Sequence, residues 1–224
     1  MTEAEWLASD DPTPMLALGR RETGDRKLRL FAVACCRRIW PLIRRQQWRR
    51  AVEAAEGVAD RTVSEQQRRV IQSATFQALK EHRRHSPAYS ALRAARVTYY
   101  CLEKRIRPSK VMTVAVGAAS GKCEARGKLW ARRYHREKAA TAHLLRDVFG
   151  NPFRPVTADP AWLTSTVVSL AQTIYEERAF DRLPILADAL EDAGCDSAEV
   201  LAHCRGEGPH VRGCWAIDLL LGKG

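Results

Sequence analysis

Apolar side chains recur every three or four residues along most of this chain, and this spacing limits the fold more than any other feature. An i, i+3, i+4, i+7 spacing places apolar groups on one face of an α-helix. Residues 25–43 show it most clearly, and Pro41 is expected to kink or end this helix near Trp40. The apolar face there consists of Leu28, Phe31, Ala32, Cys35, Ile39, Leu42 and Ile43.

The same reasoning predicts helices along the rest of the chain, with a capped first turn at Thr2–Glu5 and a second short helix after Asp11. Residues 111–116 remain ambiguous, because β-branched residues favour a strand while a short apolar run also fits a buried helix. Short helices joined by short turns indicate an all-α fold, either a multi-helix bundle or stacked helical hairpins. The predicted helices span 47–59, 64 to about 81, 88–105, 124–149, 162–180, 181–193, 196–204 and 209–222.

Charge and turn residues divide the chain into two parts. The net charge is +11, yet acidic residues outnumber basic ones in the last third. Gly150-Asn151-Pro152 is the clearest helix stop, because glycine suits the left-handed position after a helix and proline cannot continue it. We therefore expect a basic helical body at 1–150 and an acidic helical unit at 156–224, which could also pack as one domain.

Composition also bears on the compartment. No stretch approaches the roughly 18 apolar residues that a membrane span needs, and residues 1–14 lack the apolar core of a secretory signal. The seven cysteines are an odd number, and a chain of this length does not need a disulfide framework. We expect a cytoplasmic protein with reduced thiols and no membrane partner.

Four candidate zinc ligands lie close together near the C-terminal end: His203, Cys204, His210 and Cys214. Zinc prefers four nitrogen or sulfur ligands in a tetrahedron, and a turn between two helices can bring them together. However, adjacent residues such as His203 and Cys204 point about 100° apart on a helix, and no C-x-x-C pair is present. The alternative interpretation is an apolar Cys214 beside Trp215 and a solvent-facing His210.

Motifs for phosphate binding or catalysis are incomplete. Gly117 to Cys123 is similar to a phosphate-binding loop, but only three residues separate Gly117 from Gly121, and Cys123 replaces the magnesium-binding hydroxyl. A glycine-rich loop is the simpler interpretation. Cys35 has arginine neighbours that would lower a thiol pKa, but its position on the apolar face favours burial. We predict no catalytic residues, and a non-enzymatic role is favoured while enzyme activity stays open.

Paired arginines on the predicted helices form the candidate nucleic-acid-binding residues. A basic face neutralises phosphates and releases counterions, and the tryptophans and tyrosines among the pairs could stack on bases. Alternatively, these aromatic residues belong to the core, and the acidic C-terminal third neutralises the basic body. The candidate residues are Arg37, Arg38, Arg44, Arg45, Arg49, Arg50, Arg83, Arg84, Arg132 and Arg133, and the pair Arg68-Arg69 follows the same pattern.

Three blocks of the sequence resemble an uncharacterised, heavily paralogous family of planctomycete-type bacterial proteins. The blocks are DRKLRLFAVACCRRIW at 25–40, LLRDVFGNPFRPV at 144–156 and GPHVRGCWAIDLLLG at 208–222. The middle of the chain, about 61–140, departs from the family because it is rich in arginine where the family tends to be rich in alanine. Residues 183–194 are also similar to a short domain that accompanies repeat proteins in the same bacteria.

Neither resemblance brings a known activity, and both imply a helical accessory module. The preferred function is therefore a non-catalytic protein-interaction or scaffold module with an unknown protein partner. Nucleic-acid binding through the paired arginines is the alternative, and a zinc-stabilised helical domain is the third hypothesis.

Overall fold

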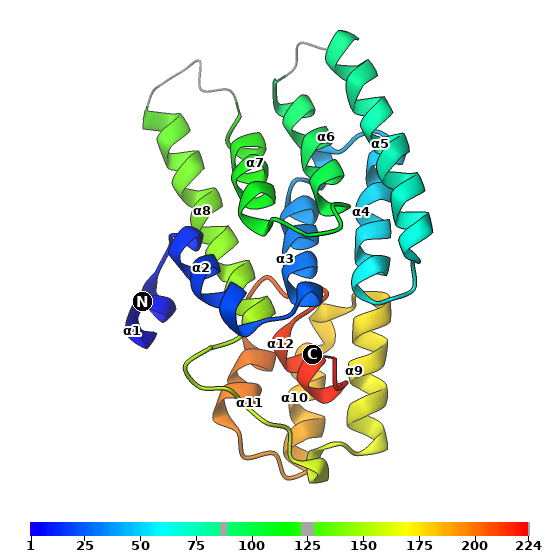
Figure 1. Ribbon diagram of the computed structural model, residues 1–224. Helices are drawn as coiled ribbons and strands as arrows, with labels where there is room; N and C mark the ends of the chain where they lie inside the picture. Colours follow the sequence, from blue (N-terminus) through cyan, green and yellow to red (C-terminus); the bar gives the residue numbers. More distant parts are fainter. Residues whose placement is uncertain (86–88, 122–127, 224) are drawn as a thin grey trace. The chain divides into compact units, whose positions relative to one another are not determined.

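The computed structural model is all-α, as the sequence predicts (Figure 1). It describes residues 1–85, 89–121 and 128–223, without the side chains of 20–22, 84–85 and 89–90. The chain divides into two compact units, Met1–Ala142 and His143–Gly224. Among the described helices, none is long and apolar enough to cross a bilayer.

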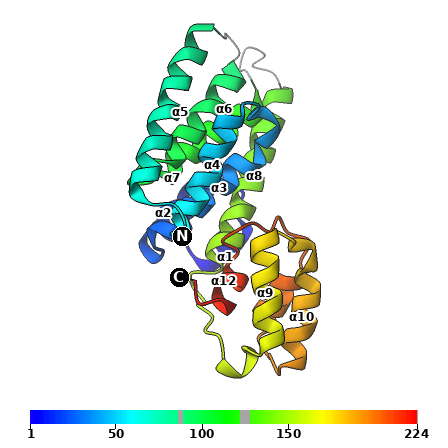
Figure 2. The same ribbon diagram turned by 90° about the vertical axis from the view of Figure 1, so that its right-hand side faces the viewer.

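The N-terminal unit is a bundle of helices that run up and down beside one another. Helix α3 lies at its centre, where it packs against α4, α6 and α7 (Figures 1 and 2). Its elements are α1 (Glu3–Ala8), α2 (Pro12–Glu22), α3 (Asp25–Arg38), η1 (Trp40–Leu42), α4 (Gln46–Ala59), α5 (Glu65–His85), α6 (Tyr89–Cys101), α7 (Pro108–Ser120) and most of α8 (Lys128–Phe149).

Local signals explain several of these boundaries. The Thr2 hydroxyl accepts from the Glu5 backbone N–H and the Glu5 carboxylate accepts from the Thr2 N–H, so the predicted capping box is present. Helix α3 ends at Arg38, just before the turn that contains Pro41. The ambiguous segment 111–116 is helical and lies within α7, which begins at Pro108.

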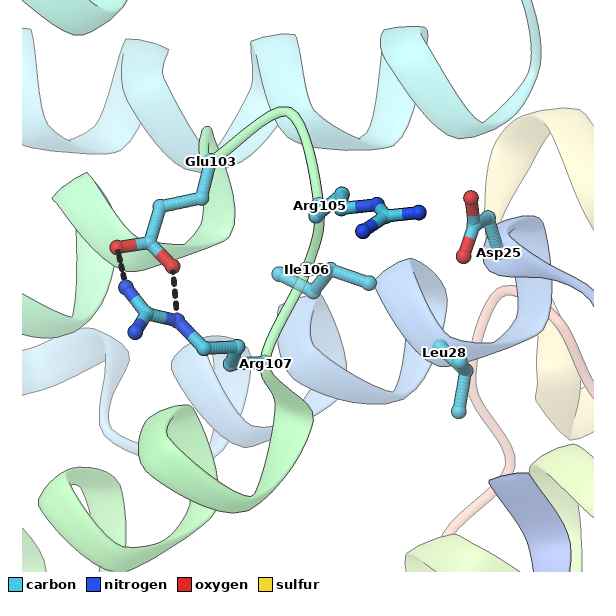
Figure 3. A pocket seen from close by; sticks show the side chains of 6 residues that line it. All are labelled: Asp25, Leu28, Glu103, Arg105, Ile106 and Arg107. Carbon is cyan, nitrogen blue, oxygen red and sulfur yellow. Dashed lines mark hydrogen bonds and ion pairs between the residues drawn. The ribbon is translucent and has the colours of Figure 1, made fainter. Parts of the chain in front are cut away.

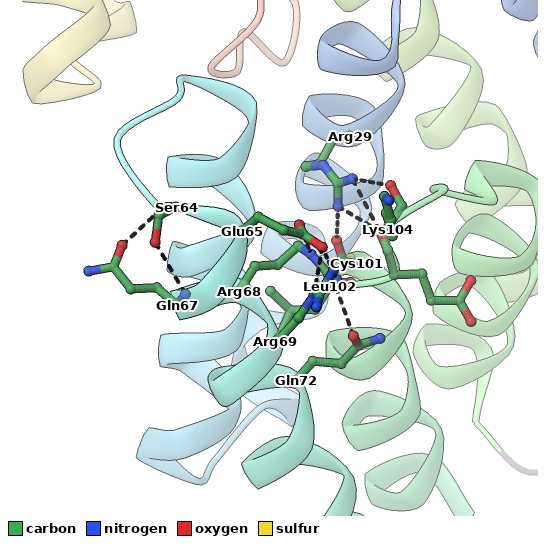
Figure 4. A network of polar contacts seen from close by, with 11 residues as sticks. Arg29, Ser64, Glu65, Gln67, Arg68, Arg69, Gln72, Cys101, Leu102 and Lys104 are labelled. Atoms are coloured by element: carbon green, nitrogen blue, oxygen red, sulfur yellow. Dashed lines mark hydrogen bonds and ion pairs between the residues drawn. The ribbon is translucent and has the colours of Figure 1, made fainter.

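Two buried arginines hold the C-terminal end of α6, as Figure 4 shows. Arg29, on α3, donates hydrogen bonds to the carbonyls of Cys101 (2.6 Å), Glu103 and Lys104. Arg68, on α5, donates to the Leu102 carbonyl and pairs with Glu65 (2.7 Å). Because the last carbonyls of a helix lack partners within it, these guanidinium groups fasten α6 to α3 and α5.

The C-terminal unit is built around an apolar core that includes Ile174, Tyr175, Leu186 and Ile217. Helices α9 and α10 lie side by side in it (Figure 2). Its elements are the end of α8, η2 (Pro160–Trp162), α9 (Ser165–Glu177), η3 (Phe180–Arg182), α10 (Leu183–Asp192), α11 (Ala198–Arg205) and α12 (Trp215–Leu220).

Two predicted helices of this unit begin later than their apolar periodicity indicates. Helix α9 begins at Ser165, because the Thr164 hydroxyl caps it by accepting from the Val167 N–H. The last helix begins at Trp215 and not at Pro209. The segment between α11 and α12 is therefore largely non-helical, and it contains His210.

The units divide inside α8, before the Gly150 turn at which the sequence indicates a boundary. Gly150 does end α8 with a positive φ of 68°, as predicted. The last turns of α8 nevertheless belong to the C-terminal unit, because Asp147 bonds to the Val211 N–H (2.9 Å) and Gly150 lies against the Trp215 ring.

Candidate metal centre

Four side chains that can bind metal converge in the C-terminal unit. Asp147 comes from the end of α8, His203 from α11, His210 from the segment after α11, and Cys214 from the position before α12. One ligand atom from each lies within 4.8 Å of the other three. Residues far apart in the sequence therefore form one compact cluster.

The individual distances are those of a hydrogen-bonded network. Nε2 of His203 is 3.0 Å from Sγ of Cys214 and 3.3 Å from Oδ1 of Asp147. Nδ1 of His210 is 2.9 Å from the same Asp147 oxygen. A zinc ion with bonds of about 2.0–2.3 Å holds its ligand atoms roughly 3.2–3.8 Å apart, so small movements would seat it.

Neighbouring groups orient two of the four side chains as metal ligands require. The second oxygen of Asp147 accepts a hydrogen bond from the Val211 N–H. Nε2 of His210 lies 3.1 Å from the Gly206 carbonyl, to which it donates its proton. A histidine ligand that donates its other N–H to a carbonyl is typical of metal sites. Nδ1 of His210 also donates, to Asp147, so the ring carries both protons and would release the Nδ1 proton on binding a cation.

His203 is arranged differently, because Trp215 Nε1–H donates to its Nδ1 at 3.0 Å. In a neutral imidazole that accepts at Nδ1, the proton resides on Nε2, which faces Asp147 and Cys214. If a metal bound at Nε2, this proton would move to Nδ1. The Nδ1–H and the Trp215 Nε1–H would then be two donors facing each other, and their hydrogen bond would be lost. His203 can therefore join a metal only if the Trp215 indole gives up this hydrogen bond.

Burial and charge set the protonation of the cluster. Burial raises the pKa of the Cys214 thiol well above its ordinary value, and the Asp147 carboxylate raises it further. Burial also favours a higher pKa for Asp147, but hydrogen bonds from His203 and His210 outweigh it, and the net pKa is lowered. A bound cation would instead favour the Cys214 thiolate, because a coordinating thiol is deprotonated.

The structure brings together three of the four residues that the sequence nominates, and adds one. His203, His210 and Cys214 belong to the cluster, whereas Cys204 lies in the apolar core and is not part of it. Burial raises the pKa of Cys204 to about 12. Neighbouring residues on a helix point in different directions, which is why α11 directs His203 and Cys204 to different places.

Asp147 is the candidate ligand that sequence reasoning missed. It follows Leu144 by three residues and precedes Val148, and both of these are buried. A carboxylate on the apolar face of a helix is unusual, because a buried charge needs a partner. The position of Asp147 on the apolar face could have indicated a buried carboxylate that needs a partner. It does not identify which distant residues provide that partner.

The candidate nucleic-acid-binding arginines have two kinds of environment. Arg37 and Arg38 form ion pairs with Glu56 (2.8 Å) and Glu137 (2.7 Å), and Arg49 donates to the Ile43 carbonyl (2.8 Å). The side chain of Arg84 lies outside the described residues. The exposed members are Arg44, Arg45, Arg50, Arg83, Arg132 and Arg133, together with the partly covered Arg38.

The segment that is similar to a phosphate-binding loop begins inside a helix. Gly117 lies inside α7, and Gly121 follows the end of this helix with φ 82°. Val111–Val116 is therefore not the strand of a phosphate loop. Lys122 and Cys123 lie outside the described residues.

A pocket of about 480 Å³ in the N-terminal unit is lined by Asp25, Leu28, Glu103, Arg105, Ile106 and Arg107. Figure 3 shows the ion pair between Glu103 and Arg107 in it. It is wide open and its charges are largely opposed, which gives it no evident chemistry.

Comparisons with protein families, with curated proteins and with solved structures find no match to this chain. The resemblance to the planctomycete-type family therefore remains a prediction.

Proposed function

We propose that the C-terminal unit binds one zinc ion and that the ion fixes the fold of a non-catalytic helical module. The observation that supports this is the convergence of Asp147, His203, His210 and Cys214, with their ligand atoms within 4.8 Å of one another. Nitrogen, sulfur and carboxylate ligands in a set of four are the combination that zinc prefers.

The ligand set favours a structural ion over a catalytic one. Catalytic zinc sites keep one position for water or substrate, whereas structural sites take all four ligands from the protein. Here the protein can supply four, and both Asp147 and Cys214 are buried. Three protein ligands and a water would remain only if His203 kept its hydrogen bond with Trp215.

Stabilisation by a metal also suits the local structure. His210 and Cys214 lie in or next to the largely non-helical segment between α11 and α12. Small units with limited cores commonly use a metal to hold such segments. The module would then present a fixed helical surface to a protein partner, which is the interaction role expected from the sequence.

The test is the metal content of the full-length protein, purified without chelators and measured by plasma mass spectrometry. We expect close to one zinc per chain, and loss of the ion from both Cys214→Ala and His210→Ala. Cys204→Ala is the matched control, because Cys204 is equally buried in the same core but lies outside the cluster. Cobalt substitution should give a sulfur-to-metal absorption band in the control and not in Cys214→Ala.

Trp215 fluorescence decides whether His203 is the fourth ligand. If it is, adding zinc to chelator-treated protein should shift the emission, because the indole loses its hydrogen bond to Nδ1. An unchanged spectrum with full zinc binding would indicate a site of three protein ligands. If neither the native protein nor the treated protein binds zinc in the micromolar range, the cluster is a hydrogen-bonded network and the proposal is wrong.

A further inference from the structure

The paired arginines, scattered over about a hundred residues of sequence, gather at one end of the N-terminal unit. The chain leaves α3 at Arg38, turns through η1 and enters α4 at Gln46 at this end (Figure 1). The C-terminal end of α5 and the N-terminal half of α8 reach the same end. We call this surface the arginine end and define it by Arg37, Arg38, Arg44, Arg45, Arg49, Arg50, Arg83, Arg132 and Arg133.

Side-chain contacts confirm that these segments meet. The Trp48 ring of α4 packs against the His82 ring of α5, with centroids 4.9 Å apart. Arg38 of α3 pairs with Glu137 of α8 at 2.7 Å. The end of α3, the start of α4 and the end of α5 therefore lie together, and α8 reaches this group through the Arg38–Glu137 pair.

Much of its positive charge is not neutralised. Arg37 and Arg38 form ion pairs with Glu56 and Glu137, respectively. The exposed Arg44, Arg45 and Arg50 make no ion pair with any residue that the structure describes. A concentrated positive field of this kind attracts a polyanion.

The aromatic residues hold the guanidinium groups and are not exposed to bind bases. Arg37 lies 4.2 Å and Arg49 5.1 Å from the centre of the Trp40 ring. Arg45 lies 5.3 Å from the centre of the Trp48 ring, and Trp48 is buried. A guanidinium stacked on an aromatic face keeps N–H groups at its edge for an oxyanion. Arg37 and Arg49 already use some of theirs on Glu56 and the Ile43 carbonyl, so Arg45 is the stacked residue best placed to bind phosphate.

We infer that the arginine end binds double-stranded nucleic acid through its phosphates, without reading sequence. Arginine matches phosphate with paired hydrogen bonds, and a duplex offers the densest row of phosphates. A protein partner is less suited, because protein interfaces need an apolar centre. Segment 37–50, which carries six of the nine arginines, exposes no large hydrophobic side chain, although Leu129 at the start of α8 is exposed. This function is separate from the metal site, which lies in the other unit.

The experiment measures binding of the full-length protein to a labelled duplex of about 20 base pairs by fluorescence anisotropy, in salt from about 50 to 200 mM. The variant is Arg44→Gln/Arg45→Gln/Arg50→Gln. The control is Arg69→Gln/Lys104→Gln/Arg105→Gln, which removes three exposed charges near the opposite end. Circular dichroism verifies that both variants remain folded.

We expect the native protein and the control to bind with a steep salt dependence. The variant should bind at least about tenfold more weakly, with a slope of log K against log salt smaller by about 2 to 3. An equal loss of duplex affinity in the variant and in the control would overturn the assignment of binding to the arginine end. Tighter binding to single strands, or equal binding to polyglutamate, would overturn the duplex assignment. A native protein that binds no duplex at low salt would overturn the whole inference and leave the zinc proposal untouched.

Discussion

At the scale of single residues, the arginines of this protein have different structural roles according to their burial. Arg29 is 5% exposed and donates hydrogen bonds to three carbonyls at and just after the end of α6. The side chain of Arg38 is 35% exposed and pairs with a single carboxylate, that of Glu137. Sequence alone shows two basic residues on the same helix. Only the packing shows that Arg29 is buried and bonded to the end of α6, whereas Arg38 is partly exposed.

This difference can be measured with Arg29→Met and Arg38→Met. The first leaves buried carbonyls without donors, and we expect the free energy of unfolding to fall by about 3 kcal/mol. The second leaves the buried carboxylate of Glu137 without this partner and should cost about 1–2 kcal/mol. Urea denaturation followed by circular dichroism gives both values, and equal losses would contradict the capping role of Arg29.

The candidate metal site was predictable only in part, for a reason that also lies at the residue scale. His203, His210 and Cys214 fall in one short segment, where their residue types attract notice. Asp147 is distant in sequence and looks like an ordinary helical acid, so its contribution depends on tertiary packing. Cys204 shows the converse, since its residue type suits zinc but its direction on α11 takes it into the core.

At the scale of elements, the turn after α8 depends on one glycine. Gly150 has φ 68°, and a Cβ there would lie 3.1 Å from Cγ of Trp215. Gly150→Ala should therefore destabilise the protein by about 2 kcal/mol, through backbone strain and this contact. Gly194→Ala is the control, because φ is 82° there but a Cβ meets nothing within 4 Å. It should cost about 1 kcal/mol, and an equal loss in both would show that the Trp215 contact is unimportant.

Helix existence was predictable from periodicity, and helix starts were less so. The apolar spacing of α4 and α10 matches their observed span within one or two residues, whereas for α3 the spacing continues to Ile43 and Pro41 is the signal that places its end. Segment 111–116 could not be assigned, because its β-branched residues fit either structure. Burial of α7 against α3 and α6 decides the matter in favour of a helix. The start of α12 was missed because Pro209 is compatible with a helix start that the chain does not use.

At the scale of the whole molecule, the unit boundary inside α8 changes which fragment should fold. Residues 156–224 lack Asp147 and Gly150, whereas 143–224 contain the complete cluster. Expressed separately, 143–224 should be helical by circular dichroism and bind one zinc ion. The shorter fragment should bind zinc more weakly and unfold at a lower temperature. Equal stability of the two would place the boundary near Gly150 after all.

The all-α class and the separation into a basic and an acidic part follow from patterns along the chain. The gathering of the arginine pairs does not, because it depends on helices running alternately in opposite directions. That alternation places the end of α3, the start of α4 and the end of α5 together. The positions of the arginine pairs in the sequence do not show whether the arginines gather on one surface or are distributed around the bundle.

The order in which the cluster's members are translated has a consequence for folding in the cell. Asp147 leaves the ribosome early, before the α9, α10 and α11 segments that form most of the C-terminal core. Its partners His210 and Cys214 emerge only after these helices. During synthesis, Asp147 must therefore remain hydrated or engage temporary partners. If the cluster binds a metal ion as proposed, all four ligands are present only after Cys214 has been synthesised.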